Sequence, residues 1–265
     1  MENPLDLDAY LTRIGYHGPL AATETCLAGL HEAHVGAIPF ENLDVLRGET
    51  IALDLPSLMA KLVHARRGGY CFEHGMLFKA VLDRIGFGTH ILTARVRLDG
   101  TRVAPRSHML LKVDTREGAF LADVGFGGFG LLRPIPLLPD VVTHVPGAAY
   151  RLRHEHGLWV LEGDVGDDNF SDYYAFTLEA QYPVDIEVAN HYVATHPSSI
   201  FRRTLTAQLT RADRRVVLRN LRLEIHQGDE RHTIELPDEA ALVATLEKEF
   251  GLAVPNGMRL TLPDN

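Results

Sequence analysis

The chain has 265 residues, of which 26 are basic and 35 acidic, and its formal net charge is −9. Apolar residues make up 46% of the chain, which is enough for a sizeable core and too many for a disordered segment. The negative charge argues against broad binding of nucleic acid or of anionic membranes, while a local basic site for a phosphorylated cofactor stays compatible with it.

The sequence shows no targeting or membrane-spanning pattern. Residues 1–10 include acidic side chains and lack the apolar core of a signal peptide. No stretch approaches the roughly 18 consecutive apolar residues of a transmembrane helix. We therefore expect a cytoplasmic protein that does not bind membranes.

The first third of the chain predicts four helices, each with a capping residue or a glycine stop. They are expected at about residues 6–15, 23–35, 54–68 and 71–86. Asp54 and Pro56 suit the start of the third helix, and Gly86 suits the end of the fourth.

From about residue 88 the pattern changes to short apolar runs and alternation, which is typical of strands. Strands are expected at residues 90–98, 108–114, 120–124, 150–154, 158–162 and 174–178. The last third predicts a hairpin of residues 215–226 and 231–236 around 227–229, and then a helix that begins near Asp238 and ends at Gly251. Because helices and strands are segregated, we predict an α+β fold with three parts.

Of the two cysteines, Cys26 and Cys71, the second has the surroundings of a nucleophile. It follows Gly68 and Gly69 and opens a helix, where unpaired N–H groups and the helix dipole favour an anion such as a thiolate. Arg67 and its neighbour Arg66 would add positive charge if they point toward it. The alternative is that Cys71, like Cys26, is a small buried core residue. We expect both cysteines to be reduced.

His108 and Asp123 are candidate partners of Cys71. They lie on two expected strands that a short turn joins, so an antiparallel hairpin would bring them close on one face. An isolated carboxylate in an apolar strand is costly unless it is paired, and a histidine N–H is a natural partner that would also fix the tautomer. The alternative is that the two residues have separate structural roles.

A glycine-rich loop follows Asp123 and contains Gly125, Gly127 and Gly128. Its N–H groups are candidate cofactor ligands, as a cradle for a phosphate or a carbonyl, although the loop matches no nucleotide-binding signature. Tight turns are the alternative explanation.

The remaining polar clusters suggest no metal site. His31 and His34 lack the HExxH spacing, so we interpret them as part of a solvated or half-buried helix face. Four arginines precede His108 and either form a solvated strand face or help to bind an anionic cofactor. They are Arg95, Arg97, Arg102 and Arg106.

The run from Arg67 to Glu73, followed by His108 and by residues 123–127, resembles the arylamine N-acetyltransferases. Further ordered blocks resemble the same family. They are residues 10–16, 38–44, 181–185, Asn190 and 195–201. One departure is Gly75, where the family usually has Asn, and it bears on acceptor preference or rate more than on the catalytic residues.

The resemblance implies a Cys71–His108–Asp123 triad in a core like that of cysteine proteases. It implies a helical bundle (1–86), a β-barrel (87–190) and an α/β lid (191–265). It also implies acetyl-CoA as the acyl donor in a ping-pong reaction and an arylamine or hydrazine as the acceptor. Phe126 and Val96 would line the acceptor pocket, and the protein would be a monomer or a homodimer.

Three rival functions use the same residues differently. A hydrolase would pass the acyl group to water and need no CoA. An amide synthase would act on a carrier-bound polyketide and ignore acetyl-CoA. A binding module would have no turnover, but an intact set of Cys71, His108 and Asp123 argues against it.

Overall fold

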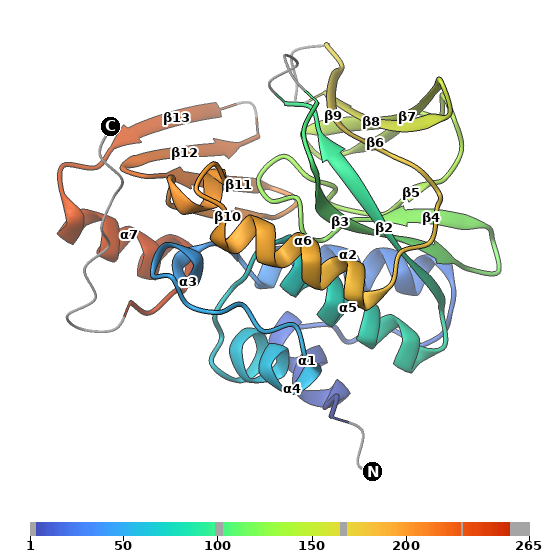
Figure 1. The fold of residues 1–265 in the computed structure, drawn as a ribbon, viewed down its shortest axis with the longest axis horizontal. Coiled ribbons are helices and arrows are strands. Elements are labelled where there is room, and N and C mark those ends of the chain that lie inside the picture. The colour runs from blue at the N-terminus through green and yellow to red at the C-terminus, as the bar shows by residue number, and fades with distance from the viewer. Residues whose placement is uncertain (1–3, 99–102, 165–168, 229, 255–265) are drawn as a thin grey trace.

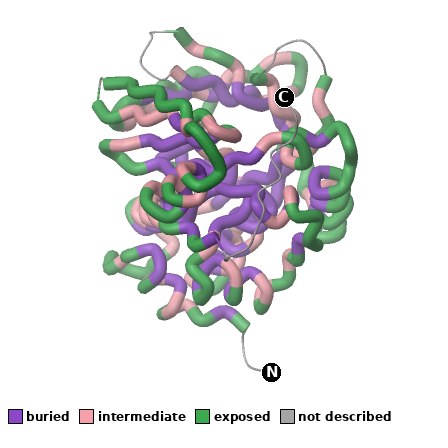
Figure 2. The backbone as a smooth tube through the Cα atoms, turned by 90° about the vertical axis from the view of Figure 1, so that its left-hand side faces the viewer, coloured by how far each residue is buried: buried purple, intermediate pink, exposed green. Residues whose placement is uncertain are grey.

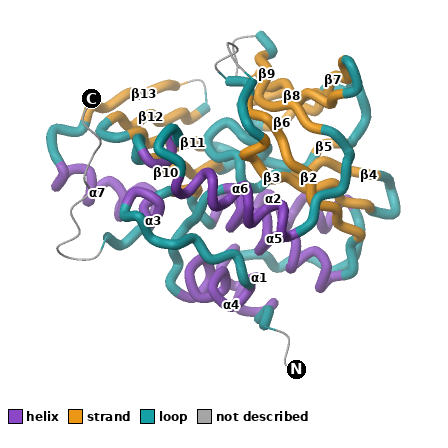
Figure 3. The backbone as a smooth tube through the Cα atoms, in the orientation of Figure 1, coloured by secondary structure: helices purple, strands orange, loops and turns teal. Residues whose placement is uncertain are grey.

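Helices and strands occupy separate regions of the molecule (Figure 1), so the predicted α+β class is confirmed. This computed structural model describes residues 4–98, 103–164, 169–228 and 230–254. Within these ranges, every helix is too short or too polar to cross a membrane. Figure 3 shows the helices gathered beside two separate groups of strands.

The helical region starts its predicted helices at the expected residues, but the second ends at Ala37 instead of about residue 35, and the third ends at His64 instead of about residue 68. Its helices are α1 (Leu7–Ile14), α2 (Glu24–Ala37), α3 (Leu43–Leu46), α4 (Leu55–Leu58), a π-helical turn (Met59–His64) and α5 (Cys71–Ile85). The side chains of Asp6, Thr23 and Asp54 accept N–H groups of the first turns of α1, α2 and α4. Gly86 ends α5 in the left-handed conformation.

The central strands form one antiparallel sheet of eight strands that curls into a nearly closed barrel. Its order is β5-β4-β3-β2-β9-β8-β7-β6. The strands are β2 (Gly88–Val96), β3 (Arg106–Asp114), β4 (Ala119–Ala122), β5 (Ile135–Pro136), β6 (Thr143–Val145), β7 (Ala148–Glu155), β8 (Leu158–Asp164) and β9 (Ser171–Phe176). Pro139, just after β5, bridges to Leu152 of β7 and so links the two ends of the sheet.

The last part of the chain forms a second antiparallel sheet. After α6 (Pro183–Thr195) and a 3-10 turn (Ile200–Arg202) come β10 (Thr206–Thr210), β11 (Arg214–Arg219), β12 (Arg222–Gln227), β13 (Glu230–Glu235) and α7 (Glu239–Phe250). The short strand β1 (Phe40–Glu41) pairs with β10, so the helical region contributes an edge to this sheet.

Two further differences from the sequence prediction lie in the last third of the chain. The expected strand at residues 215–226 is two strands, because Asn220 adopts a left-handed conformation (φ 50°) and turns the chain between β11 and β12. The helix α6 was not predicted, and the expected boundary between residues 190 and 191 falls inside it. Part of the expected 227–229 turn, residue 229, lies outside the described residues.

The barrel sheet has a helix on its outer face and its own core inside. Alternate residues of β3 point to opposite faces. Met109 and Leu111 belong to the core shared with the helices, whereas Leu110 belongs to the core inside the barrel. His108 shares the face of Leu110. A third core lies between α7 and the second sheet, and Figure 2 shows the buried backbone running through the middle of the molecule.

Candidate active site

Cys71 is the first residue of α5 and is 3% exposed. The position suits an anion, since the N–H groups of the first helical turn have no partner inside the helix. Its sulfur lies 3.8 Å from the carbonyl oxygen of Ser107, the residue before His108. The helix start thus brings the sulfur to the beginning of the strand that carries the histidine. Both cysteines are free and buried.

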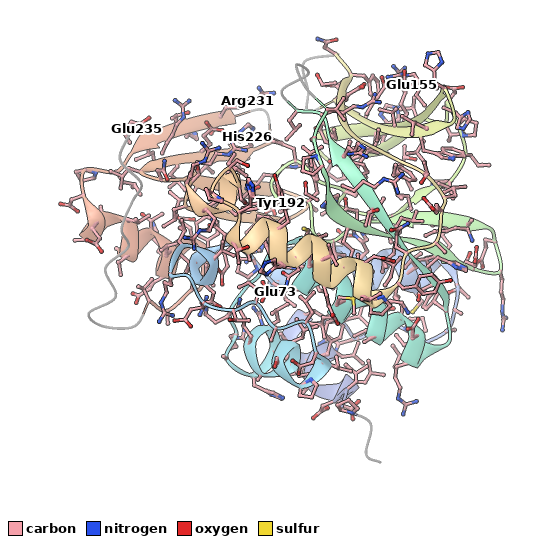
Figure 4. The ribbon with its side chains drawn as sticks, viewed as in Figure 1. Glu73, Glu155, Tyr192, His226, Arg231 and Glu235 are labelled. Carbon is pink, nitrogen blue, oxygen red and sulfur yellow. The ribbon has the colours of Figure 1, made fainter. Side chains whose placement is uncertain are left out.

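Buried ion pairs hold the peptide that leads into Cys71. Glu73 (labelled in Figure 4) accepts the N–H of Tyr70 with one carboxylate oxygen and binds Lys61 with the other, at 3.1 and 2.7 Å. Burial raises the pKa of Glu73 to about 7, although the Lys61 ammonium opposes the shift. The start of α5 is therefore fixed by a side chain that faces away from the sulfur.

Arg67 does not supply the expected positive charge at the sulfur, because its guanidinium is paired elsewhere. Arg67 binds Glu41 at 2.8 Å and Asp44 at 2.9 Å. Arg66 has a left-handed backbone (φ 54°), and its carbonyl accepts from Arg13. The pairing of Arg67 with residues 41 and 44 ties together two sequence blocks that the family resemblance singled out.

His108 and Asp123 are directly paired. His108 Nε2 lies 2.7 Å from Asp123 Oδ2, and the two side chains are 4% and 0% exposed. This contact uses Nε2, so Nδ1 is the ring nitrogen left for Cys71. β3 and β4 form the expected antiparallel hairpin, in which Leu111 lies opposite Ala122.

The charges of this group reinforce one another. Burial alone would lower the pKa of His108, but the Asp123 carboxylate and, after it, the Cys71 sulfur raise it to about 10. Burial alone would raise the pKa of Asp123, but the His108 ring and the N–H of Gly125 hold it below its usual range. The geometry therefore favours an imidazolium beside the Asp123 carboxylate.

Two aromatic side chains enclose the imidazole, Phe126 from the glycine-rich loop and Tyr174 from β9. Phe126 packs edge-on against His108, with ring centroids 5.2 Å apart, and Tyr174 lies at 5.1 Å on a tilted plane. Phe126, which was predicted to line the acceptor pocket, also stacks on Tyr173 at 5.5 Å. Only its place after the aspartate could have indicated Phe126, and the aromatic pair Tyr173–Tyr174 had no signal beyond its expected strand.

The glycine-rich loop packs closely against protein. A Cβ atom at Gly125 would lie 2.8 Å from Cys71 Cα, and Cβ atoms at Gly127 and Gly128 would lie 2.7 and 2.6 Å from the side-chain oxygen of Gln208. Thr210 of β10 also donates to the carbonyl of Gly128 at 2.7 Å. The second sheet and Cys71 therefore both touch this loop, which explains its glycines without a ligand.

Val96 lies apart from Phe126, at the end of β2. It lines a hollow of about 860 Å³ that Phe126 does not border, whereas Phe126 and Asp123 border a hollow of only about 20 Å³. The larger hollow also contains three of the four candidate arginines. Arg97 is paired with Glu155 and Asp172 there, and Arg106 with Glu179. Arg102 lies outside the described residues.

The interpretation of His31 and His34 as a solvated or half-buried helix face is wrong. Both are fully buried, and both are hydrogen-bonded on both ring nitrogens. Their partners come from residues 10, 74, 123 and 132, which are distant in sequence. Among the described residues, no three His, Cys, Asp or Glu side chains are grouped as metal ligands.

The departure at Gly75 has a packing reason. A Cβ atom there would lie 2.9 Å from the sulfur of Met109 on β3. The glycine lets α5 lie close to the strand that carries His108.

Comparisons with known proteins agree with this fold over most of its length. A family model described as N-acetyltransferase matches residues 24–259. The arylamine N-acetyltransferase of Escherichia coli strain K12 is 39% identical over 253 residues, covering 94% of this chain and 89% of that protein. The structure of Nocardia farcinica arylamine N-acetyltransferase has a TM-score of 0.89 at 40% identity, covering 95% of this chain and 90% of that one.

A third likeness is to Mycobacterium marinum arylamine N-acetyltransferase in complex with CoA, with a TM-score of 0.88 at 37% identity over 93% of this chain and 92% of that one. These likenesses, together with the fold, define an acyltransferase. Within that class, the chain belongs to the arylamine N-acetyltransferase family.

Proposed function

We propose that this protein transfers the acetyl group of acetyl-CoA to the nitrogen of an arylamine or hydrazine, through an acetyl group held on Cys71. The observation that carries the proposal is the His108–Asp123 pair at 2.7 Å, with the Cys71 sulfur beside the imidazole. The family relationship supports the donor, since the M. marinum relative was solved with CoA. Cys71, His108 and Asp123 are then nucleophile, acid–base and orienting residue.

The first half of the reaction loads the enzyme. The Cys71 thiolate attacks the carbonyl carbon of the thioester, and the bond between that carbon and the CoA sulfur breaks. The His108 imidazolium gives its proton to the departing CoA thiolate. The Asp123 carboxylate orients the ring and stabilises its charged form throughout. N–H groups at the start of α5 are suited to stabilise the oxyanion.

The second half releases the product. The amine nitrogen attacks the acetyl carbon on Cys71, its proton passes to His108, and the carbon–sulfur bond to Cys71 breaks. The products are the amide and the original thiolate–imidazolium pair. Arylamines suit this step because their weakly basic nitrogen is unprotonated at neutral pH.

The two substrates are proposed to reach the site from its loop side. Phe126 covers one face of His108, which suits an apolar wall for an aromatic acceptor. Gly127 and Gly128 lie between the catalytic residues and the second sheet, which suits a cofactor contact. Gly125 is a weaker candidate, because its N–H already donates to Asp123 Oδ1 at 3.0 Å. Val96 would contribute to the acceptor site only from the separate hollow at the end of β2.

The test is to mix the pure protein with acetyl-CoA and no amine, and to record its intact mass. We expect a gain of one acetyl group, about 42 Da, that an arylamine or hydrazine then removes. Cys71→Ala should show no gain. Cys26→Ala, which removes the other buried cysteine, should still be acetylated.

Other outcomes of this experiment would favour one of the rival functions. An adduct that water clears as fast as an amine would favour a hydrolase. If acetyl-CoA gives no adduct but a larger carrier-bound acyl thioester does, the protein would be an amide synthase. If neither donor loads Cys71, the proposed activity fails.

A further inference from the structure

Helix α2 presents two buried histidines, one helical turn apart, toward the two halves of the candidate active site. His31 and His34 are both 0% exposed. They pack edge-on against the same ring, that of Phe78 on α5, with centroids 5.8 and 5.3 Å away. The ring nitrogens of both histidines are bonded to residues other than Cys71 and His108, so we assign neither a role in the proposed chemistry itself.

His31 contacts the backbone at the two ends of the segment that carries the glycine-rich loop. Its Nε2 accepts the backbone N–H of Asp123 at 3.1 Å, and its Nδ1 lies 3.1 Å from the carbonyl oxygen of Leu132. An N–H can only donate and a carbonyl can only accept, so the ring must be the neutral tautomer with its proton on Nδ1. Both ring nitrogens are therefore committed to backbone partners.

His34 contacts the nucleophile side through a second histidine. Its Nε2 lies 2.9 Å from Nδ1 of His74, whose Nε2 lies 3.0 Å from the carbonyl oxygen of Gly69 and 3.2 Å from that of Pro39. Its own Nδ1 bonds the Tyr10 hydroxyl at 2.8 Å. The carbonyls fix the direction of this chain, in which Tyr10 donates to His34, His34 to His74, and His74 to Gly69.

Helix α2 is thus linked to the backbone near both Cys71 and Asp123, directly through His31 and indirectly through His34 and His74. Gly69 lies two residues before Cys71, and the Asp123 N–H belongs to the residue whose carboxylate orients His108. The Asp123 carboxylate is itself bonded to His108 and to the N–H of Gly125. Both carboxylate oxygens and the backbone N–H of Asp123 therefore have named partners, which are His108, Gly125 and His31.

We propose that His31 is a positioning residue of the reaction, which holds Asp123 against His108 by bonding the aspartate's backbone to α2. This inference rests on the proposed function for its kinetic readout only. Catalysis by such a triad depends on sub-ångström placement, and a misplacement of about 1 Å can cost about 100-fold in rate. The His34–His74 chain serves as the matching anchor for the peptide before Cys71.

The test compares His31→Leu, His31→Gln and His31→Asn. Gln carries an acceptor and a donor at nearly the spacing of the two ring nitrogens, Asn carries the same groups on a shorter arm, and Leu carries neither. We expect kcat to fall about 10- to 100-fold in the Leu and Asn variants with little change in KM for acetyl-CoA, and Gln to restore most of it.

A second readout does not depend on acetyl transfer. The rate at which iodoacetamide alkylates Cys71 reports the thiolate held by the imidazolium, and its pH profile reports His108 in its pair with Asp123. If His31→Asn displaces Asp123, the imidazolium of His108 loses part of its stabilisation and gives up its proton at a lower pH. The thiolate–imidazolium pair should then persist over a narrower pH range, with a lower upper limit. Tyr10→Phe is the matched control, since it removes a buried hydrogen bond of the same network far from Asp123.

A purely structural role for His31 predicts a different pattern. The melting temperature would fall in the Asn variant as in Tyr10→Phe, while kcat per folded molecule and the alkylation profile would match the wild type. That result overturns the proposal. If the Leu variant does not fold, the comparison of His31→Asn with His31→Gln tests the proposal. Equal kcat values and equal alkylation profiles in these two variants would again reject a positioning role for His31. If wild-type protein takes no acetyl group from acetyl-CoA, the proposed function fails while the alkylation profile still tests His31.

Discussion

Gly125 lies against the backbone of Cys71, so close that a Cβ atom on residue 125 would be 2.8 Å from Cys71 Cα and 2.9 Å from its carbonyl oxygen. Real side chains essentially never approach backbone atoms at such distances. The loop after Asp123 and the start of α5 can therefore meet only if residue 125 is glycine. This contact places the loop that follows Asp123, the proposed orienting residue, directly against Cys71, the proposed nucleophile.

Gly125→Ala should separate these two segments. Because the obstructing atoms are backbone, we expect about 1–3 kcal/mol of destabilisation from overpacking and a loss of about 10- to 100-fold in the rate of Cys71 acetylation. Urea denaturation and the rate of CoA release check the two parts. Gly88→Ala is the control, since a Cβ there meets its nearest atom at an ordinary 3.5 Å. Full activity in a folded Gly125→Ala protein would contradict the contact.

Gly75→Asn, which restores the usual family residue, should be limited by Met109. The new Cβ would lie 2.9 Å from the Met109 sulfur, a side-chain atom that can move at some cost. We expect the single variant to lose about 1–3 kcal/mol. Gly75→Asn combined with Met109→Ala should lose less than the sum of the two single changes, which a double-mutant cycle measures. Additive losses would show that residues 75 and 109 do not compete for space.

Much of the fold was predictable because its signals are local. Asp6 and Thr23 cap helices where the pattern indicated, Gly86 ends α5, and β3 and β4 form the expected hairpin, although Asp123 follows β4 instead of lying within it. Such features depend on a residue and its near neighbours. The pairing of His108 with Asp123 could be predicted because one short hairpin connects the two residues.

The features that were not predicted depend on partners distant in sequence, or on a helix whose apolar residues do not follow a clear helical period. His31 and His34 have the sequence of an ordinary polar face, and only contacts with residues 74, 123 and 132 bury them. Helix α6 carries apolar residues on its exposed face as well as its buried one, so no single face stands out. Its exposed apolar side chains are Val184, Val188 and Tyr192.

The buried histidines should make the fold sensitive to acid. Burial lowers the pKa of His31 and His74 to about 4, and that of His34 well below its ordinary value. Asp123 and Glu32 face His31, whereas Arg13 faces His34 and His74, and Lys61 faces His74. The unfolded histidines bind protons near pH 6.5, so between about pH 6.5 and 4 the unfolded chain binds more protons than the folded one.

The sign follows from that difference. The stability that the neutral rings of His31 and His74 contribute is complete above about pH 6.5 and is lost as the pH falls toward 4, by up to about 3 kcal/mol for each of these two rings. His74→Gln, which keeps a donor and an acceptor but does not titrate, should show a smaller drop in free energy of unfolding between pH 7.5 and 5. His17→Gln, at an exposed position, is the control. An equal drop in all three proteins would exclude His74 as a source of acid sensitivity.

Lys61 should matter more to stability than its exposed counterparts, because it neutralises a buried carboxylate. It lies 2.7 Å from Glu73 and 2.7 Å from Asp44, and the Glu73 side chain is only 3% exposed. Because the pKa of Glu73 is about 7 even with Lys61 present, Glu73 should take up a proton in Lys61→Met at neutral pH, and the loss should approach about 3 kcal/mol only at alkaline pH, where the carboxylate stays charged without its cation. Adding Glu73→Gln should recover part of the loss, since the amide oxygen can still accept the N–H of Tyr70 without carrying charge.

The control is Lys79→Met, which breaks an exposed pair of similar length, with Asp83 at 2.6 Å, and should cost less than about 0.5 kcal/mol. Urea denaturation of the four proteins at alkaline pH decides the matter, and similar losses for Lys61→Met and Lys79→Met would mean that burial of Glu73 does not set the strength of its pair.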